Sequence, residues 1–596
     1  MPACSSPTSD AHLASEHSIH QSQLLTSNIQ LRHMRHLIIY IIALLLFPLS
    51  ISAKGVKNPK FFKKARTVQL TILAYDKEGK IIQGQGYFAG EDHDVMVEYS
   101  LLKNAVQVKA VDASGKEYGL KRVKGANSLY NIARLSCSTP DRFPQPMPLL
   151  ADALAVGSVV YVMPLCNNEK DAACFADTIA KVETFEEGHN YYTLTAALDE
   201  RLSGAPVFTE QGELIGSVQL SADEKAKHGY ILSVTYPLSL TIAPVDINKY
   251  DLRSLLIPRQ IPADEEQATT FLYLSNKKDT LIYRANVEDF VAQFPTNSTG
   301  YIQLAELEAS LGHYTKAEAV YADGLSHCTE SREEIHHSFA KLLYQSGLRN
   351  EPLAEGWTMD KALEQANAAY EAKPLPIFIA LQGMILYGQQ NYSDACQKFI
   401  EMSQTNMRSA EYFLYASQCK QMMSSPAEEI LALQDSAVAC YSKPYPKEAA
   451  NCLYLRAKTL ATLNRFREAV SDLNEYEHLL SANVSDAFYY EREQLEMQCR
   501  MFQQALNDID RAVALQPQEP LYYAEQAAVN YRVGQVDQAL EAAQKAVKLD
   551  DTFADAYRIL GICLNEKGKK TDARKALQKA IELGDEMAQT VLDKMK

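Results

Sequence analysis

One serine, Ser203, lies in a tight turn of sequence Ser-Gly-Ala-Pro between two apolar runs, where a side chain could act as a nucleophile. A serine hydroxyl is a poor nucleophile unless a histidine accepts its proton and a carboxylate orients that histidine. His93 precedes a predicted strand, and His189 and His228 fall in predicted loops, so each is a candidate base. The chemistry to consider is acyl transfer, and the alternative is a turn kept for close packing alone.

The elements around this turn are predicted to be strands. Between Ala65 and Thr235 the chain shows short apolar runs bounded by turn residues, such as VQLTILAY, DVMVEY and LIGSVQL. Glycine supports the same division, because 14 of the 25 glycines lie between Gly55 and Gly229 and none lies between Gly388 and Gly534. Since glycine serves turns and weakens helices, a turn-rich, all-β first half and a helical second half are expected.

The second half has an internal period of 34 residues. Small residues recur at that spacing, and a second set recurs seven residues further on. This pattern resembles the tetratricopeptide repeat (TPR), in which alanines allow two antiparallel helices to pack closely. The resemblance implies about eight helix pairs stacked into a solenoid with a concave groove. The repeated residues are Ala505, Ala539 and Ala573, and Ala512, Ala546 and Ala580.

The TPR resemblance also indicates which side chains project into the concave groove. Aromatic and cationic residues at these positions would bind proteins or extended peptides. Each of them also fits an ordinary solvated or packing role. The predicted groove residues are Tyr454, Lys458, Tyr490, Arg532 and Arg558.

The first half resembles a serine protease. Residues 195–216, TAALDERLSGAPVFTEQGELIG, are similar to the nucleophile region of trypsin-like proteases of the HtrA type, with Ser203 at the nucleophile. Upstream, GQGYF at Gly84 and NIARL at Asn131 resemble two further segments of that family in the same order. The resemblance implies two β-barrels with the site between them.

The catalytic positions of that family are altered. The resemblance places Ser100 at the histidine, Asn131 at the aspartate and Arg201 at the glycine of the oxyanion turn. Serine is not basic, and an amide cannot stabilise an imidazolium ion. We therefore expect an inactive trypsin-like domain, a pseudoprotease, that acts as part of a binding scaffold. The alternative is a serine endopeptidase in which Ser203 has a non-standard base and the repeats recruit clients.

The N-terminal region predicts export. An apolar run from Leu37 to Phe47 follows Arg32 and Arg35 and precedes the small residues SISA, as in a secretory signal. The signal would span about 34–53, with the true start at Met34. The expected location is extracytoplasmic, in the periplasm. The alternative is an uncleaved signal that anchors the chain in the inner membrane, which is the only membrane contact expected.

Charge and cysteine usage exclude other classes. The formal charge of −15 disfavours nucleic acid as a partner. The 11 cysteines are spread without metal-ligand spacing, so neither a metal nor another cofactor is expected. Cys166 and Cys174 are close enough in sequence to form a disulfide in an oxidising compartment.

The predicted architecture is multidomain, with an all-β double barrel followed by an all-α TPR solenoid. We assign residues 1–53 to the signal and 54–245 to the trypsin-like domain. Residues 246–298 are assigned to a linker and solenoid cap, and 299–596 to the repeat array.

Overall fold

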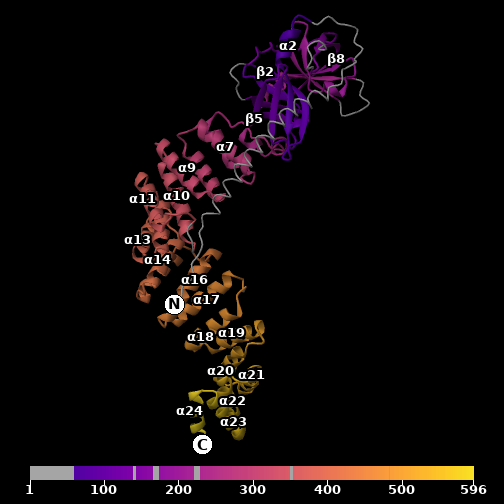
Figure 1. Cartoon of the computed structure of the whole chain (residues 1–596). Helices are drawn as coiled ribbons and strands as arrows, with labels where there is room; N and C mark the ends of the chain where they lie inside the picture. Colours follow the sequence, from indigo (N-terminus) through magenta and orange to yellow (C-terminus); the bar gives the residue numbers. More distant parts are fainter. Residues whose placement is uncertain are drawn as a thin grey trace, which may run out of the picture. The chain divides into compact units, whose positions relative to one another are not determined.

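The chain folds into two compact units, Met1–Gln293 and Phe294–Lys596. Figure 1 shows their elements in a computed structural model. The structure describes residues 59–137, 143–165, 174–220, 228–349, 353–481 and 483–595. The predicted signal segment and Cys166 lie outside these residues. Within them, no helix is both long and apolar enough to cross a membrane.

The first barrel is a closed six-stranded sheet with the strand order β1-β2-β3-β6-β5-β4. All its neighbouring strands are antiparallel. Two short helices accompany it, α2 before β1 and α3 after β3. The elements are α2 (Phe62–Val68), β1 (Gln69–Tyr75), β2 (Ile81–Ala89), β3 (Asp94–Val97), α3 (Tyr99–Leu102), β4 (Gln107–Asp112), β5 (Glu117–Asn127) and β6 (Ile132–Cys137).

The second barrel is also closed, with the order β10-β11-β12-β9-β8-β7. Its neighbouring strands are antiparallel as well. A short 3-10 helix, η2 (Glu200–Leu202), precedes β10. The strands are β7 (Val159–Val162), β8 (Phe175–Phe185), β9 (His189–Leu194), β10 (Pro206–Thr209), β11 (Leu214–Gln219) and β12 (Tyr230–Ser233).

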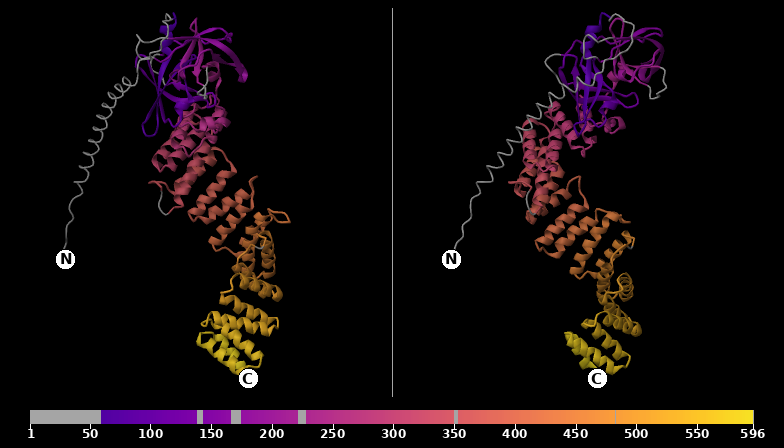
Figure 2. Two further views of the ribbon diagram at one scale, coloured as in Figure 1. Left: turned by 90° about the vertical axis from the view of Figure 1, so that its right-hand side faces the viewer. Right: turned by 45° about the vertical axis from the view of Figure 1, so that its right-hand side comes forward.

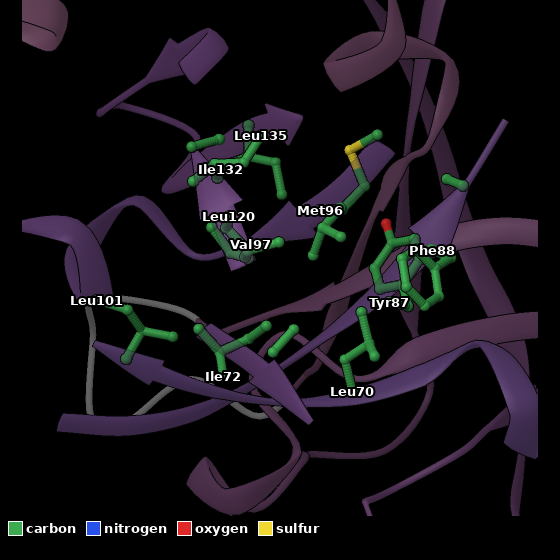
Figure 3. Close-up of a cluster of buried hydrophobic side chains, with 14 of the residues drawn as sticks. Leu70, Ile72, Tyr87, Phe88, Met96, Val97, Leu101, Leu120, Ile132 and Leu135 are labelled. Atoms are coloured by element: carbon green, nitrogen blue, oxygen red, sulfur yellow. The ribbon is translucent and has the colours of Figure 1, made fainter. Parts of the chain in front are cut away.

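Apolar side chains fill the first barrel. Leu70 and Ile72 of β1 alternate inward with Thr71 between them, and both are fully buried. Figure 3 shows them facing Met96 and Leu135 from the opposite strands. Burial of such side chains supplies about 1.5 to 3 kcal/mol each, which holds the barrel closed.

Helices α4 to α7 belong to the first unit rather than to the array. Arg122 of β5 forms an ion pair with Asp289 of α7, which ties the helices to the first barrel. The compact unit accordingly ends at Gln293, within the segment assigned from sequence to a linker and cap. These helices are α4 (Thr235–Ser239), α5 (Tyr250–Arg253), α6 (Glu265–Leu274) and α7 (Thr280–Gln293).

The second unit is a series of antiparallel helix pairs, seen in Figure 2. The repeated alanines Ala505, Ala539 and Ala573 are fully buried where the paired helices meet. In the described part of the chain the pairs are α8 (Ser298–Ser310) with α9 (Tyr314–His327), α10 (Arg332–Gly347) with α11 (Met359–Ala372), α12 (Pro376–Gly388) with α13 (Tyr392–Ser403), α14 (Ala410–Met422) with α15 (Ala427–Val438), α16 (Ala450–Thr462) with α17 (Phe466–Leu479), α18 (Asp486–Gln498) with α19 (Phe502–Leu515), α20 (Pro520–Arg532) with α21 (Val536–Leu549), and α22 (Ala554–Glu566) with α23 (Lys570–Glu582), followed by α24 (Glu586–Lys594).

The predicted fold class is confirmed by this architecture. Two closed six-stranded barrels precede a helical solenoid, as the strand and repeat patterns indicated.

Candidate functional site

Ser203 follows η2 directly and is separated from β10 by Gly204 and Ala205. Its half-buried hydroxyl donates a hydrogen bond to the carboxylate of Glu98. Glu98 stands between β3 and α3, so this bond joins the second barrel to the first. The structure therefore gives Ser203 a carboxylate partner where a catalytic site would need a histidine.

Asn131 and Ser100, the predicted aspartate and histidine positions, lie beside this pair. The side chain of Asn131 donates from Nδ2 to Glu98 Oε1 over 3.1 Å and accepts from the Ser100 N–H over 2.8 Å. Its φ of 45° is in the left-handed region, which asparagine tolerates. The structure thus brings Ser203, Asn131 and Ser100 together around Glu98, a residue that sequence reasoning missed.

The three histidines considered as alternative bases bind elsewhere. Within the described residues, none of their rings forms a hydrogen bond with Ser203. The ring of His93 stacks on Phe143, with centroids 4.4 Å apart. The ring nitrogens contact Pro144 O for His93, Thr235 Oγ1 and Ser239 Oγ for His189, and Leu194 O for His228.

The turn before Ser203 uses both backbone donors that an oxyanion hole would need. The Arg201 N–H donates to Asp199 Oδ1 over 2.9 Å, and the Ser203 N–H donates to Glu200 O over 3.1 Å. The Arg201 side chain also binds Asp199, and these bonds lower the pKa of the Asp199 carboxyl to about 2. Because both N–H groups are taken, this turn offers neither to a developing oxyanion.

Two neighbouring residues hold the turn in this conformation. Leu202 is 4% exposed and packs in the second-barrel core with Val207 and Ile231. Rotating the turn would expose this side chain, at a cost of about 1.5 to 3 kcal/mol. Gly204 has a φ of +74°, and a Cβ there would lie 3.2 Å from Gln85 O. The turn is therefore fixed by an apolar anchor on one side and a close backbone approach on the other.

Gln85 of β2 fastens the turn from the first barrel. Its Nε2 donates to Arg201 O and to Ser203 O, each over 2.8 Å, and its Oε1 accepts from the Leu165 N–H over 3.1 Å. The side chain is buried, so all three bonds form away from solvent. Sequence reasoning noted Gln85 only as part of a strand, because its partners lie in the other barrel.

Burial controls the electrostatics of Glu98. Loss of solvent raises the pKa of its carboxyl, and the hydrogen bond from Ser203 lowers the pKa by less. A desolvated carboxylate is a better proton acceptor than a solvated one. The pair could move a proton from Ser203 to Glu98, but the turn offers no donor for the charge that acyl transfer would create.

Two predicted groove residues, Arg532 and Arg558, line one hollow of the array. This hollow, which we call the α20–α22 groove, has a volume of about 680 Å³. Arg558 is paired with Asp555 and with Asp585, the latter at 2.5 Å from Nε. Among the described residues, no carboxylate pairs with Arg532.

The other predicted groove residues interact within the array. Tyr454 donates from its hydroxyl to Glu491 over 3.0 Å, and Lys458 lies 3.3 Å from the same carboxylate. The ring of Tyr490 packs against that of Tyr522, with centroids 5.5 Å apart. These three side chains are therefore held by neighbours, in contrast to Arg532.

Of the two cysteines predicted to pair, only Cys174 is in the described part of the chain. It directly precedes β8, and its side chain is 5% exposed and belongs to an apolar cluster that contains residues of both barrels. The pairing itself stays a prediction.

Comparison with known proteins finds partial similarities. No family model matches the chain. A segment of 73 residues is 33% identical to the small glutamine-rich tetratricopeptide repeat-containing protein 2 of Mycosarcoma maydis. The match covers 12% of this chain and 21% of that protein.

Several solved structures are similar to parts of the chain. YrrB, described as a TPR protein with an unusual peptide-binding site, is 20% identical, with a TM-score of 0.29, over 33% of this chain and 99% of its own. MamA is 21% identical, with a TM-score of 0.26, over 29% of this chain and 96% of its own. The inactive form of a serine-to-alanine mutant of Rv3671c from M. tuberculosis H37Rv is 18% identical, with a TM-score of 0.25. The similarity covers 32% of this chain and 92% of that chain.

Proposed function

We propose that this protein is an exported, non-enzymatic binding scaffold that joins an inactive trypsin-like domain to a peptide-binding repeat array. The observation that carries the proposal is the Ser203 turn. Its hydroxyl is bound by Glu98, and the two backbone N–H groups that would stabilise an oxyanion are used inside the turn. Loss of one such donor already costs about 3 kcal/mol of transition-state stabilisation in serine proteases.

The binding role is assigned to the array. Helix pairs of this kind present the first helix of each pair on a concave side, where extended segments dock. The α20–α22 groove supplies a hollow of about 680 Å³ there, and on its wall lies Arg532, with which no described carboxylate pairs. Proteins or extended peptides are the partners that such a surface fits.

A second candidate function is a serine endopeptidase that uses Glu98 as the base for Ser203. The hydrogen bond between the two side chains favours it, since the nucleophile and a carboxylate are already in contact. This reading requires η2 to rearrange so that at least one N–H is freed.

Hydrolysis assays separate the two functions. The chain lacking residues 1–53 is incubated with casein and, separately, with a fluorophosphonate probe, and Ser203→Ala is the matched control. The scaffold predicts no turnover and no labelling above that of the control. Labelling of the parent that Ser203→Ala abolishes would show a reactive nucleophile and overturn the non-enzymatic assignment.

The array and export are tested independently. A chain ending at Gln293, the limit of the first compact unit, should lose partners that the longer chain retains from an envelope extract. Unchanged recovery would contradict the binding role of the array. A reporter fused after Lys54 should leave the cytoplasm, and a reporter retained there would contradict export.

A further inference from the structure

The α20–α22 groove has an apolar floor between charged walls. Ala524 and Ala528 of α20 leave a space beside the helix. Ile559 and Ile562 of α22 line the same space. Because small side chains on one helix face larger apolar ones on the other, the floor can receive a single apolar side chain. The charged residues above this floor differ from end to end.

At one end of the groove the charge is negative. Glu525 of α20 lines the hollow, and behind it Glu493 of α18 is completely buried. Glu493 Oε2 accepts from Gln494 over 2.7 Å, whereas Glu493 Oε1 has no hydrogen-bond partner within the described residues. The nearby Glu525 carboxylate adds to the effect of burial and raises the pKa of Glu493. A cation placed at this end would offset the charge of the Glu525 carboxylate, whose ionised form burial disfavours.

The nearest cation of the chain does not fill this role. Arg558 lies close enough to lower the pKa of Glu525, but burial outweighs it and the net pKa is raised. The guanidinium of Arg558 is already shared between Asp555 and Asp585. The charge of Glu525 at the acidic end is therefore not neutralised by Arg558.

The other end of the groove carries the cation Arg532. Arg532 follows Glu525 by seven residues on the same helix, which corresponds to about 10 Å along its axis. Its side chain is exposed, and no carboxylate of the described chain pairs with it. Glu566, an acidic residue of α22 that also lines the groove, accepts a hydrogen bond from Tyr531 over 3.3 Å.

We propose that the α20–α22 groove recognises an extended segment with an apolar side chain between one basic and one acidic residue. The basic residue lies at Glu525, the apolar one on the alanine floor and the acidic one at Arg532. In an extended chain, which rises about 3.3 Å per residue, a charge separation of about 10 Å corresponds to three residues. This inference names the partner chemistry of the proposed binding function and rests on that function.

The test uses the chain lacking residues 1–53 and a displayed library of nine-residue peptides. Enriched peptides should carry Lys or Arg and Asp or Glu three residues apart with an apolar residue between them. Their affinities are then measured by fluorescence anisotropy. Arg532→Glu should weaken binding about tenfold or more and change the preferred acidic residue to a basic one, as expected for paired charges across an interface.

Matched variants make the outcome decisive. Glu525→Gln should remove the preference for the basic residue, and Lys575→Glu, on the exposed face of α23, should change neither affinity nor preference. Peptides that bind without this charge pattern, or that Arg532→Glu and Glu525→Gln affect no more than Lys575→Glu does, would overturn the inference and leave the binding function intact. A library without any enriched peptide would contradict both.

Discussion

The Ser203 turn and the α20–α22 groove are both rich in polar groups, yet they differ in how those groups are satisfied. In the turn, the Ser203 hydroxyl, the N–H groups and the Gln85 amide all bind inside the chain. In the groove, no carboxylate of the described residues pairs with Arg532, and in the buried layer behind the groove Glu493 Oε1 has no hydrogen-bond partner among those residues. Polar groups whose hydrogen bonds all form within the chain indicate a structural role. Polar groups without such partners indicate a surface that binds a ligand.

The buried ion network of the array provides the strongest way to test this distinction. Arg492 is buried and bridges Asp508, at 2.6 and 2.9 Å, with Glu477 at 2.7 Å. Arg492→Met should lower the free energy of unfolding around α18 and α19 by about 3 to 5 kcal/mol, because Asp508 is left buried without a cation. Hydrogen exchange of these helices, followed by mass spectrometry, measures the loss.

The control for that experiment is Arg511→Met. Arg511 contacts the same Glu477 at 2.7 Å, but its side chain is 53% exposed. Solvent screens such a pair, so the change should stay below about 1 kcal/mol. Equal effects of the two substitutions would contradict the importance of burial.

The apolar anchor of the Ser203 turn should give the next largest effect. Leu202→Ala removes a side chain that is 4% exposed and should destabilise the second barrel by about 2 to 4 kcal/mol. Leu129→Ala, at a position that is 83% exposed, should have almost no effect. Hydrogen exchange of the backbone amides in β10 to β12 measures the difference in stability between the two variants. A Leu202→Ala variant as stable as the parent would show that the anchor does not hold the turn.

Two unsatisfied carboxyls in the array predict a pH effect. Burial raises the pKa of Glu493 and of Glu496 to about 8, from 4.5. The folded array therefore holds these protons more tightly than the unfolded chain does. The stability that these two protonated carboxyls contribute is complete below pH 4.5 and is lost as the pH rises through 8.

Glutamine substitutions test that sign. The stability of Glu493→Gln relative to the parent should grow by about 1.4 kcal/mol for each pH unit across that window. Glu496→Gln should behave alike, and Glu491→Gln, at a half-exposed carboxyl, is the control. Thermal unfolding at a series of pH values provides the comparison, and parallel curves for parent and variants would contradict the raised pKa values.

The smallest effect is expected at Ser203 itself. Ser203→Ala removes one hydrogen bond to Glu98 and leaves that carboxylate with Asn131, so the first unit should lose about 0.5 to 1.5 kcal/mol. The loss should be larger at neutral pH than in acid, because Ser203 stabilises the ionised form of Glu98. Calorimetry at two pH values measures the loss of stability. A loss that is the same at both pH values would contradict the hydrogen bond assigned between Ser203 and Glu98.

Several elements follow from local sequence. The apolar run VQLTILAY, bounded by turn residues, predicts a strand, and Leu70 and Ile72 of β1 are buried. The alanines at a spacing of 34 predict paired helices, and Ala505 and Ala539 are buried where the helices meet. Such patterns are readable because they depend on the periodicity of a single element.

The partners at the Ser203 turn are not readable in this way. Glu98 stands 105 positions from Ser203, and Gln85 stands 118 positions away. A carboxylate two residues before Ser100 was the only signal for Glu98, and a resemblance that places a histidine at Ser100 draws attention away from it.

By itself, therefore, the sequence determined the two kinds of domain, and the resemblance to trypsin-like proteases predicted Ser100 and Asn131 at the triad positions. Only the tertiary structure decided which side chains surround Ser203, because contact between the two barrels brings Glu98 and Gln85 to it. It also decided that Arg558 is paired, while no carboxylate in the described part of the chain pairs with Arg532. Helical periodicity places a side chain on a face, but neighbouring helices determine whether its charge is satisfied.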